Sequence, residues 1–232
     1  MIRSESGGAA RIRPYGPADR AAVRHLACDT ADMGRPFGDG FDAREFLADL
    51  LTRYYTDHAP DWMWVACTDD TLAGYVCAAP DERAFQRILR HHVMPALARQ
   101  VVFGDEFRRP SNRRFLARQV WDWLRHGRAT QVDKARFPAH LHLNLAPDFR
   151  GRGLGRTLLQ TCLAALARAG VVGVRASVRD DNAGAQAFFR RMGFQPLGTG
   201  WAVSPAPGLR RRSILMGLVL SGQPASEGMR HV

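Results

Sequence analysis

The stretch Arg150–Gly155, which reads Arg-Gly-Arg-Gly-Leu-Gly, constrains the fold most, because the residue pattern changes period on either side of it. Before it, between Ala139 and Ala146, leucines at positions 141, 143 and 145 alternate with polar residues, which is typical of a strand. After it, from Leu154 to Leu166, apolar residues recur at helical spacing until Gly170 ends the pattern. The sequence therefore predicts a strand, a glycine-rich turn and a helix in direct succession.

This turn is suited to binding phosphate. The first backbone N–H groups of a helix lack partners and lie at the positive end of its dipole, and nearby arginines add charge-assisted contacts. A dinucleotide fingerprint that starts at Gly151 would need glycine at position 156, where Arg156 stands. A P-loop would need Gly-Lys-Ser or Gly-Lys-Thr, and neither tripeptide occurs in the chain.

The turn instead fits the pattern [RQ]-x-x-G-x-[GA], with Arg150, Gly153 and Gly155 at its defined positions. In this respect it resembles the pyrophosphate-binding signature of the GNAT superfamily of N-acetyltransferases. A second GNAT-like pattern, N-x-x-A-x-x-F-Y-x-x-x-G-F, is matched in the right order by Asn182, Ala185, Phe188, Gly193 and Phe194, with Phe189 in place of tyrosine. The resemblance implies an α/β fold with a mixed central sheet, and acetyl-CoA as co-substrate.

The run Pro138–Leu143 also resembles a bacterial subgroup that is similar to the acetyltransferase-like domain of some O-GlcNAcases. We expect one GNAT domain over residues 10–220, a disordered N-terminus over 1–9 and a C-terminal tail over 221–232.

Asp42 and Glu45 form a capping-box pattern before a helix.

Residues 81–137 depart from a compact GNAT domain and are expected to form a helical insertion. Apolar residues at helical spacing predict one helix around Phe85–Val93 and another around Phe115–Leu124. Two interpretations stay open for the apolar faces: they cover the sheet, or they form part of the acceptor pocket, with Trp121 and Trp123 as a lid.

Composition favours a globular, cytoplasmic protein without a membrane span. The longest apolar run, Ile214–Leu220, is too short to cross a bilayer, and no apolar segment marks the N-terminus for export. The cysteines at positions 28, 67, 77 and 162 show no C-x-x-C pairing, which indicates reduced core thiols. The sequence does not determine the oligomeric state, and a homodimer stays open.

The formal net charge of +11 raises the question of nucleic-acid binding. Lys134 is the only lysine among the 33 basic residues, and the arginines are scattered apart from Arg210–Arg212. Such a distribution favours a solvated surface that attracts anionic CoA over a nucleic-acid site. Nucleic-acid binding is kept as a third hypothesis, to be tested by salt-dependent DNA binding without CoA affinity.

The resemblance also implies which residues bind acetyl-CoA. The strand would pair with the pantetheine, and the backbone N–H of Leu145 would donate to the oxyanion. The predicted cofactor-binding residues are Leu145, Ala146, Arg150, Gly151, Arg152, Gly153, Leu154, Gly155, Arg156, Thr157, Asn182, Ala185, Phe188 and Phe189. No metal is expected.

The acid–base residues depart from the family pattern. Phe189 cannot donate a proton to the thiolate as a tyrosine would, and this omission costs only roughly 2 kcal/mol at pH 7 for a thiol of pKa about 8.5. Asn144 and Ser177 stand where relatives carry acidic residues, and neither can act as a base. His142 shares a strand face with Asn144 and is the leading candidate for the base, while a histidine that hydrogen-bonds within the sheet is the alternative.

We therefore predict an N-acetyltransferase that moves the acetyl group to an amine by direct attack in a ternary complex. The acceptor, a small molecule or a protein, is not identified by the sequence. A weak base favours a weakly basic amine, because freeing an amine of pKa about 10.4 at pH 7 costs roughly 4.6 kcal/mol. The alternative is a non-catalytic acyl-CoA-binding or sensing domain, which the missing tyrosine and carboxylate favour.

Overall fold

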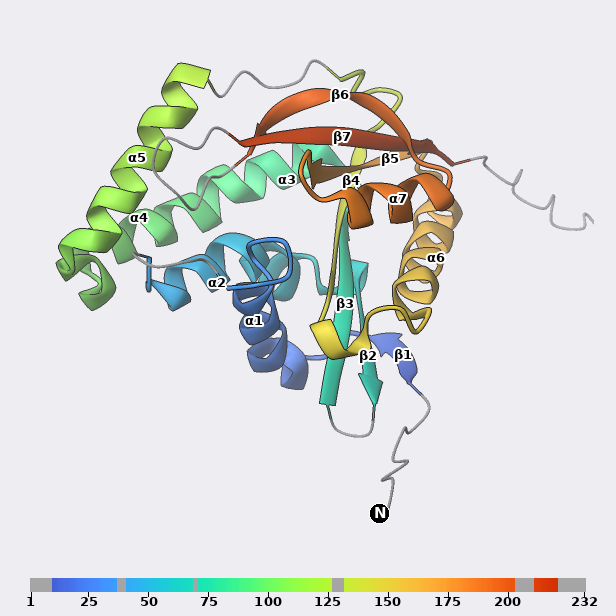
Figure 1. Ribbon diagram of the computed structural model, residues 1–232, viewed down its shortest axis with the longest axis horizontal. Helices are drawn as coiled ribbons and strands as arrows, with labels where there is room; N and C mark the ends of the chain where they lie inside the picture. The colour runs from blue at the N-terminus through green and yellow to red at the C-terminus, as the bar shows by residue number, and fades with distance from the viewer. Residues whose placement is uncertain (1–9, 37–40, 69–70, 127–131, 203–210, 221–232) are drawn as a thin grey trace, which may run out of the picture.

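The computed structural model describes residues 10–36, 41–68, 71–126, 132–202 and 211–220. The terminal segments predicted for 1–9 and 221–232 lie outside these residues. Seven strands form one mixed sheet in the order β1-β2-β3-β4-β5-β7-β6. All neighbours are antiparallel except β4 and β5, which run parallel. The predicted α/β fold class, with a mixed sheet and a helical insertion, is confirmed (Figure 1).

The strand predicted between Ala139 and Ala146 is observed as β4, which spans Ala139–Leu145. The strands are β1 (Arg11–Pro14), β2 (Met63–Thr68), β3 (Thr71–Ala79), β4 (Ala139–Leu145), β5 (Gly173–Arg179), β6 (Gln195–Ala202) and β7 (Arg211–Val219). The helices are α1 (Arg20–Asp29), α2 (Arg44–Arg53), α3 (Glu82–Ile88), α4 (Met94–Phe103), α5 (Pro110–His126), α6 (Leu154–Arg168) and α7 (Ala183–Arg191). Short 3-10 or π turns are η1 (Pro17–Asp19), η2 (Tyr54–His58), η3 (Pro60–Trp62), η4 (Leu89–Val93), η5 (Asp105–Arg108) and η6 (Pro147–Phe149).

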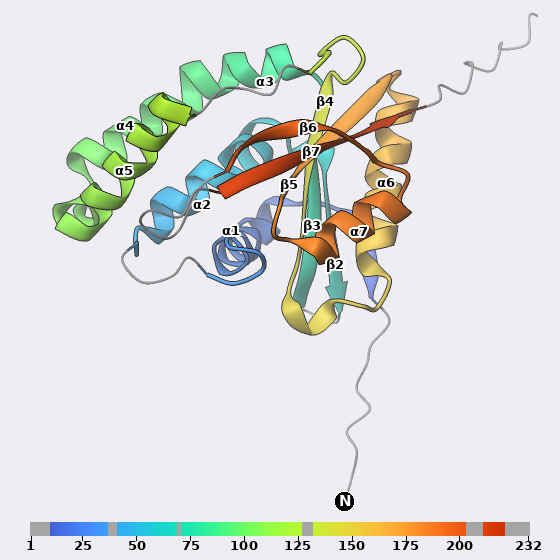
Figure 2. The ribbon, with the colours of Figure 1, turned by 45° about the horizontal axis from the view of Figure 1, so that its top comes forward.

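Each face of the sheet carries its own hydrophobic core, because side chains alternate along a strand. On β3, Tyr75 and Cys77 belong to the core beneath α1, α2 and the insertion, whereas Val76 and Ala78 belong to the core beneath α6. Figures 1 and 2 both place α6 on one side of the sheet and α1 to α5 on the other. Three of the four free cysteines are buried, and Cys67 is half-buried.

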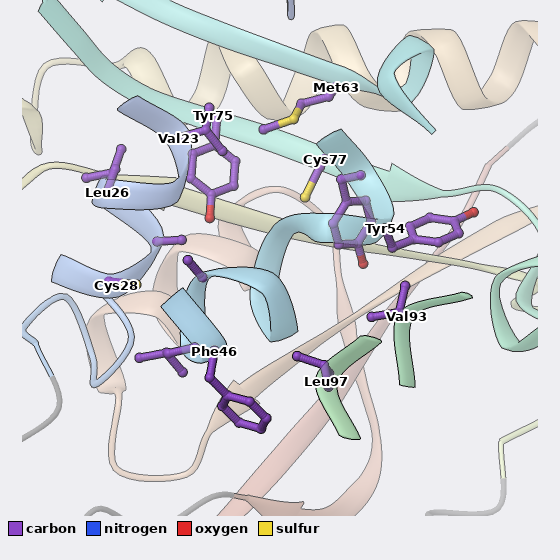
Figure 3. Close-up of a cluster of buried hydrophobic side chains, with 14 of the residues drawn as sticks. Val23, Leu26, Cys28, Phe46, Tyr54, Met63, Tyr75, Cys77, Val93 and Leu97 are labelled. Carbon is purple, nitrogen blue, oxygen red and sulfur yellow. The ribbon is translucent and has the colours of Figure 1, made fainter. Parts of the chain in front are cut away.

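The helical insertion covers the first of these cores. Helix α3, turn η4 and helix α4 follow one another without a break from Glu82 to Phe103, where the sequence predicted a shorter helix. Figure 3 shows Val93 and Leu97 of this segment beside Phe46 of α2. The apolar face of this segment therefore covers the domain, as the first of the two interpretations had it, whereas Val120, Trp121 and Leu124 of α5 are exposed.

The N-terminus of α2 is capped from a distance, so the capping box predicted for Asp42 and Glu45 is wrong. The Glu106 carboxylate accepts hydrogen bonds from the backbone N–H groups of Glu45 and Phe46, at 3.0 and 3.2 Å. The Asp42 side chain is instead bound by Asn112 of α5, at 2.6 Å. Glu106, a residue of the insertion, thus caps the N-terminus of α2, a role that the sequence pattern had assigned to Asp42 and Glu45.

Candidate acetyl-CoA site

The sheet opens into a fork between β4 and β5. Their pairing is limited to Ala139 with Val174 and His140 with Arg175, after which the two strands diverge. In Figure 1, β4 runs nearly vertically while β5 runs nearly horizontally. The fork leaves the remaining inward edge of β4 without a partner strand in the described structure.

That inward edge presents a row of backbone groups to the fork. Ala146 donates to the carbonyl of Ala73 on β3, at 2.9 Å, and it lies directly opposite that residue. Because hydrogen-bonded pairs alternate in an antiparallel ladder, Leu145, Leu143 and Leu141 turn their N–H and C=O groups away from β3 and toward the fork. Such a row can pair with the amides of an extended pantetheine chain, and it includes the Leu145 N–H predicted as oxyanion donor.

The glycine-rich turn lies where β4 ends. Gly151 and Gly153 adopt left-handed φ values of +74° and +81°, which side chains of L-residues rarely accept. Gly153 is the N-cap of α6, so the helix begins with unpaired N–H groups. A Cβ on Gly155 would stand 3.1 Å from the Leu145 side chain, so this position permits close packing of α6 on β4.

A cavity of about 1200 Å³ occupies the fork and extends to this turn. Of the predicted site residues, those that line it are His142, Asn144, Leu145, Arg150, Gly151, Gly153, Gly155, Arg156, Asn182, Ala185, Phe188 and Phe189. Four predicted residues, Ala146, Arg152, Leu154 and Thr157, lie beside the turn and do not line it. The Arg152 guanidinium instead lies over the Phe149 ring, 5.4 Å from its centre.

The lining also includes residues that sequence reasoning missed. The loop between α1 and α2 contributes Thr30, Ala31, Met33 and Gly34, and the facing strand β5 contributes Ala176, Val178 and Arg179 beside Ser177, which the sequence analysis had singled out. Nothing local marks the loop as part of a site. Its bridge between Asp32 and Arg35, and the ion pair of Asp32 with Arg179, exist only in the folded chain.

Several side chains in the cavity already have protein partners. Arg150 donates from Nε and Nη2 to the carbonyl of Leu145, at 3.2 and 3.0 Å, so it braces the end of β4. Asn182 is the N-cap of α7, where its side-chain oxygen accepts from the Ala185 N–H at 3.0 Å. Both residues therefore shape the site as well as lining it.

The described lining is strongly basic. It contains four arginines, Arg150, Arg156, Arg179 and Arg191, and neither aspartate nor glutamate. An anion of the charge of CoA is favoured in such a cavity. The turn, the backbone row and the arginines therefore fit acetyl-CoA, with pyrophosphate at the turn and pantetheine along β4.

Phe189 stands where a tyrosine would be expected and lines the cavity while only 7% exposed. Its ring packs edge to face against Phe188 and Phe194, with centroids 5.3 and 5.1 Å away. No hydroxyl is available at this position to protonate a thiolate.

The reactive face of β4 carries His142 and Asn144. Asn144 donates to the Tyr75 hydroxyl at 2.5 Å, and burial raises the pKa of that phenol. The His142 side chain is exposed to the cavity, and the rings of Tyr55 and His140 pack against it from behind. Desolvation by these neighbours, together with the charge of His140, lowers the pKa of His142 from 6.5 to about 4, so the ring is neutral at pH 7.

No described residue of the insertion lines this cavity, so a role of the insertion in the acceptor pocket stays a prediction. Trp121, one of the two residues expected to form a lid, is 55% exposed on α5. From the insertion, Glu82 and Phe85 contact His140 behind the cavity.

No helix among the described residues is long and apolar enough to span a membrane.

Solved structures share the fold. The chain is 27% identical to SsHAT, with a TM-score of 0.69 over 91% of this chain and 98% of that one. It is 17% identical to yncA from Salmonella typhimurium, solved with its cofactor acetyl-CoA, with a TM-score of 0.57 over 96% and 100% of the two chains. It is 20% identical to the ribosomal-protein-alanine N-acetyltransferase from Brucella melitensis, with a TM-score of 0.55 over 90% and 99%.

A family model described as the acetyltransferase (GNAT) family matches residues 23–194, well over half of the chain. With the fork, the glycine-rich turn and the basic cavity in place, this match means that the protein belongs to the GNAT family and is an N-acetyltransferase that uses acetyl-CoA.

Proposed function

We propose that the enzyme acetylates a weakly basic primary amine, such as an aromatic amine or a hydrazine, by direct attack in a ternary complex. The observation that supports this proposal is which titratable side chains line the cavity. Apart from its arginines, His142 is the one titratable side chain in the described lining. A neutral imidazole of low pKa is a poor base for an alkylammonium ion but an adequate one for an amine that is already unprotonated.

In this proposal each residue has a defined task. The turn and Arg156 bind the pyrophosphate, the inward edge of β4 aligns the pantetheine, and the Leu145 N–H donates to the developing oxyanion. The amine nitrogen displaces the CoA thiolate from the acetyl group, and His142 accepts the proton that the nitrogen releases. Asn144, tied to Tyr75, lies beside His142 on the same strand face.

The absence of carboxylates from the described lining also bears on the acceptor's charge. A polyamine or a lysine-rich peptide would meet four arginines in this cavity, of which Arg179 is paired with Asp32 and Asp181. Neutral or anionic acceptors avoid that repulsion. The resemblance of Pro138–Leu143 keeps the subgroup that is similar to the acetyltransferase-like domain of some O-GlcNAcases as a prediction. A cytoplasmic location and a homodimer also stay predictions.

The proposal is tested by acetyl transfer to a panel of aromatic amines, hydrazines, alkylamines and lysine peptides, followed by mass spectrometry of the products. We expect kcat/KM to be highest for the aromatic amines and hydrazines. His142→Gln should lower kcat by about 100-fold or more with unchanged acetyl-CoA affinity. The matched control, His92→Gln, alters an exposed histidine outside the cavity and should retain full activity.

A second variant tests the role of Phe189. Phe189→Tyr would supply the missing proton donor, and the gain is limited to about thirtyfold, the thiolate penalty of roughly 2 kcal/mol. A preference for lysine peptides would overturn the acceptor class. Tight acetyl-CoA binding with no transfer by either protein would favour a non-catalytic acyl-CoA-binding domain instead.

A further inference from the structure

Behind His142 lies a cluster of aromatic rings that does not line the cavity. The rings of Tyr55 and His140 both meet the His142 ring edge to face, with centroids 5.7 and 5.8 Å away. Phe85 closes the cluster, 4.5 Å from His140. For the described residues, these two ring contacts hold the His142 ring, and no side-chain hydrogen bond does so.

The two supporting rings are themselves fixed by hydrogen bonds. His140 Nε2 lies 3.1 Å from the Tyr55 hydroxyl, and His140 Nδ1 lies 3.1 Å from Glu82 Oε2. Burial alone would raise the pKa of Glu82, but hydrogen bonds from His140 and Gln86, with the charge of Arg175, lower it to about 2. The carboxylate is therefore ionised and accepts from Nδ1–H. Nε2 of the same ring forms the hydrogen bond with the Tyr55 hydroxyl.

The anchor at Glu82 is held from several sides. Arg175 Nη2 donates to Glu82 Oε2 at 2.6 Å, and Gln86 donates to its other oxygen at 3.0 Å. The Glu82 backbone N–H donates to the carbonyl of Pro138, at 3.0 Å. Because His140 and Arg175 are the last paired residues before the strands diverge, the network lies at the apex of the fork.

We propose that His140 and Tyr55, anchored by Glu82, are positioning residues that hold the His142 ring toward the cavity. This inference rests on the role of His142 in the proposed function. Neither residue lines the cavity, so neither contacts a substrate there. Their contribution is to restrict the ring to one orientation, since misplacement of a reacting group by about 1 Å can cost roughly 100-fold in rate.

The cluster also determines the electrostatics around His142. The charged and titratable groups that face His140 are Glu82 from α3, Arg175 from β5, Tyr55 from η2 and His142 on its own strand. His142 is faced by His140 on its own strand, Tyr55 from η2 and the thiol of Cys77 from β3, and His140 opposes its protonation. Replacement of His140 by asparagine, which cannot carry a positive charge, should therefore ease the protonation of His142.

The experiment compares Tyr55→Phe and His140→Asn with two matched controls, Tyr54→Phe and His92→Asn. Tyr54 is a neighbouring buried tyrosine, and His92 is an exposed histidine. Tyr55→Phe retains the ring and loses only the hydroxyl that binds His140, so it should fold. We expect kcat with the best amine to fall by about tenfold to a hundredfold in Tyr55→Phe and His140→Asn, and to be unchanged in the controls.

Acetyl-CoA affinity and a ring titration exclude a merely structural role. Calorimetry should give unchanged acetyl-CoA affinity in Tyr55→Phe, whereas a general distortion of the fork would weaken it together with kcat. NMR titration of the His142 ring, assigned with His142→Gln, should show a midpoint well below 6.5 in the wild type. In His140→Asn that midpoint should rise by about half a pH unit or more.

The outcomes separate this inference from the proposed function. If Tyr55→Phe matches Tyr54→Phe in kcat, and His140→Asn leaves the His142 titration unchanged, the positioning role is overturned. If the wild type transfers acetyl to no amine, the proposed function fails, and the NMR titration still decides whether His140 controls His142. A His142 midpoint near 6.5 in the wild type would also count against the cluster.

Discussion

At the residue scale, the left-handed glycines decide the shape of the turn. Gly153 and Gly170 lie at the two ends of α6 with φ of +81° and +76°, and a Cβ on either would meet nothing within 4 Å. A side chain at either position therefore suffers the same backbone penalty, about 1–2 kcal/mol, without a steric clash. The two positions differ in location, since only Gly153 lines the cavity.

This pair supports a controlled prediction. Gly153→Val should lower acetyl-CoA affinity by tenfold or more, because the turn must change conformation to relieve the strained φ. Gly170→Val should lose similar stability and retain acetyl-CoA affinity. Calorimetry and thermal unfolding measure both quantities, and equal affinities for the two variants would refute the assignment of the turn as the pyrophosphate site.

At the element scale, helix α2 depends on the insertion for its cap. Glu106 places a carboxylate against the first N–H groups of α2, where it satisfies two donors and interacts with the positive end of the helix dipole. Its neighbour Asp105 forms an ion pair with Arg108 in which both side chains are largely exposed. The two adjacent acids thus have very different structural roles.

We expect Glu106→Ala to lower the free energy of unfolding by about 1–2 kcal/mol, which is the usual range for loss of an N-cap. Asp105→Ala should change it by less than about 0.5 kcal/mol, as is typical of an exposed pair. Urea unfolding of the wild type and the two variants measures these changes in the free energy of unfolding. Equal losses would mean that the contact does not cap α2.

The network around Glu82 makes the attachment of the insertion pH-dependent. The folded-state pKa of about 2 lies below the ordinary value of 4.5, so the stabilisation is present above pH 4.5 and is lost as pH falls toward 2. At neutral pH, the lowered pKa of Glu82 contributes about 3 kcal/mol to the free energy of unfolding. Glu82 is 9% exposed, so the network is well shielded from solvent.

This predicts how steeply the free energy of unfolding changes between pH 5 and pH 3. The unfolding free energy of the wild type should fall more steeply over this range than that of Glu82→Gln, which has no carboxylate to protonate. Chemical unfolding at several pH values measures both slopes. Parallel slopes would show that Glu82 does not have the depressed pKa on which this argument depends.

At the scale of the whole molecule, acetyl-CoA should join the two halves of the sheet by binding in the fork between β4 and β5. A ligand at 100 times its Kd adds about 2.7 kcal/mol to the free energy of unfolding. For a chain of this size that corresponds to a rise in Tm of roughly 5–10 °C. Thermal unfolding with acetyl-CoA tests this, and Gly153→Val should lose most of the shift at the same concentration.

Sequence patterns within single elements determined much of the architecture. The alternating leucines of β4, the glycines of the turn and the helical spacing of α6 predicted these elements close to their observed bounds. The motif around Asn182 likewise pointed to residues that line the cavity, Asn182, Ala185, Phe188 and Phe189. Such signals are legible because periodicity and left-handed turns are local properties of the chain.

Contacts between distant segments were decided only by the tertiary structure. Glu106 caps α2 across 60 residues, and the α1–α2 loop joins the cavity with no local sign of doing so. His140 could be placed on the strand face by its alternation with leucine, but its bonds to Tyr55 and Glu82 depend on where β4 and β5 diverge. The physical reason is that the sequence encodes which way a side chain points from its own element, whereas its partner is determined by how the elements pack.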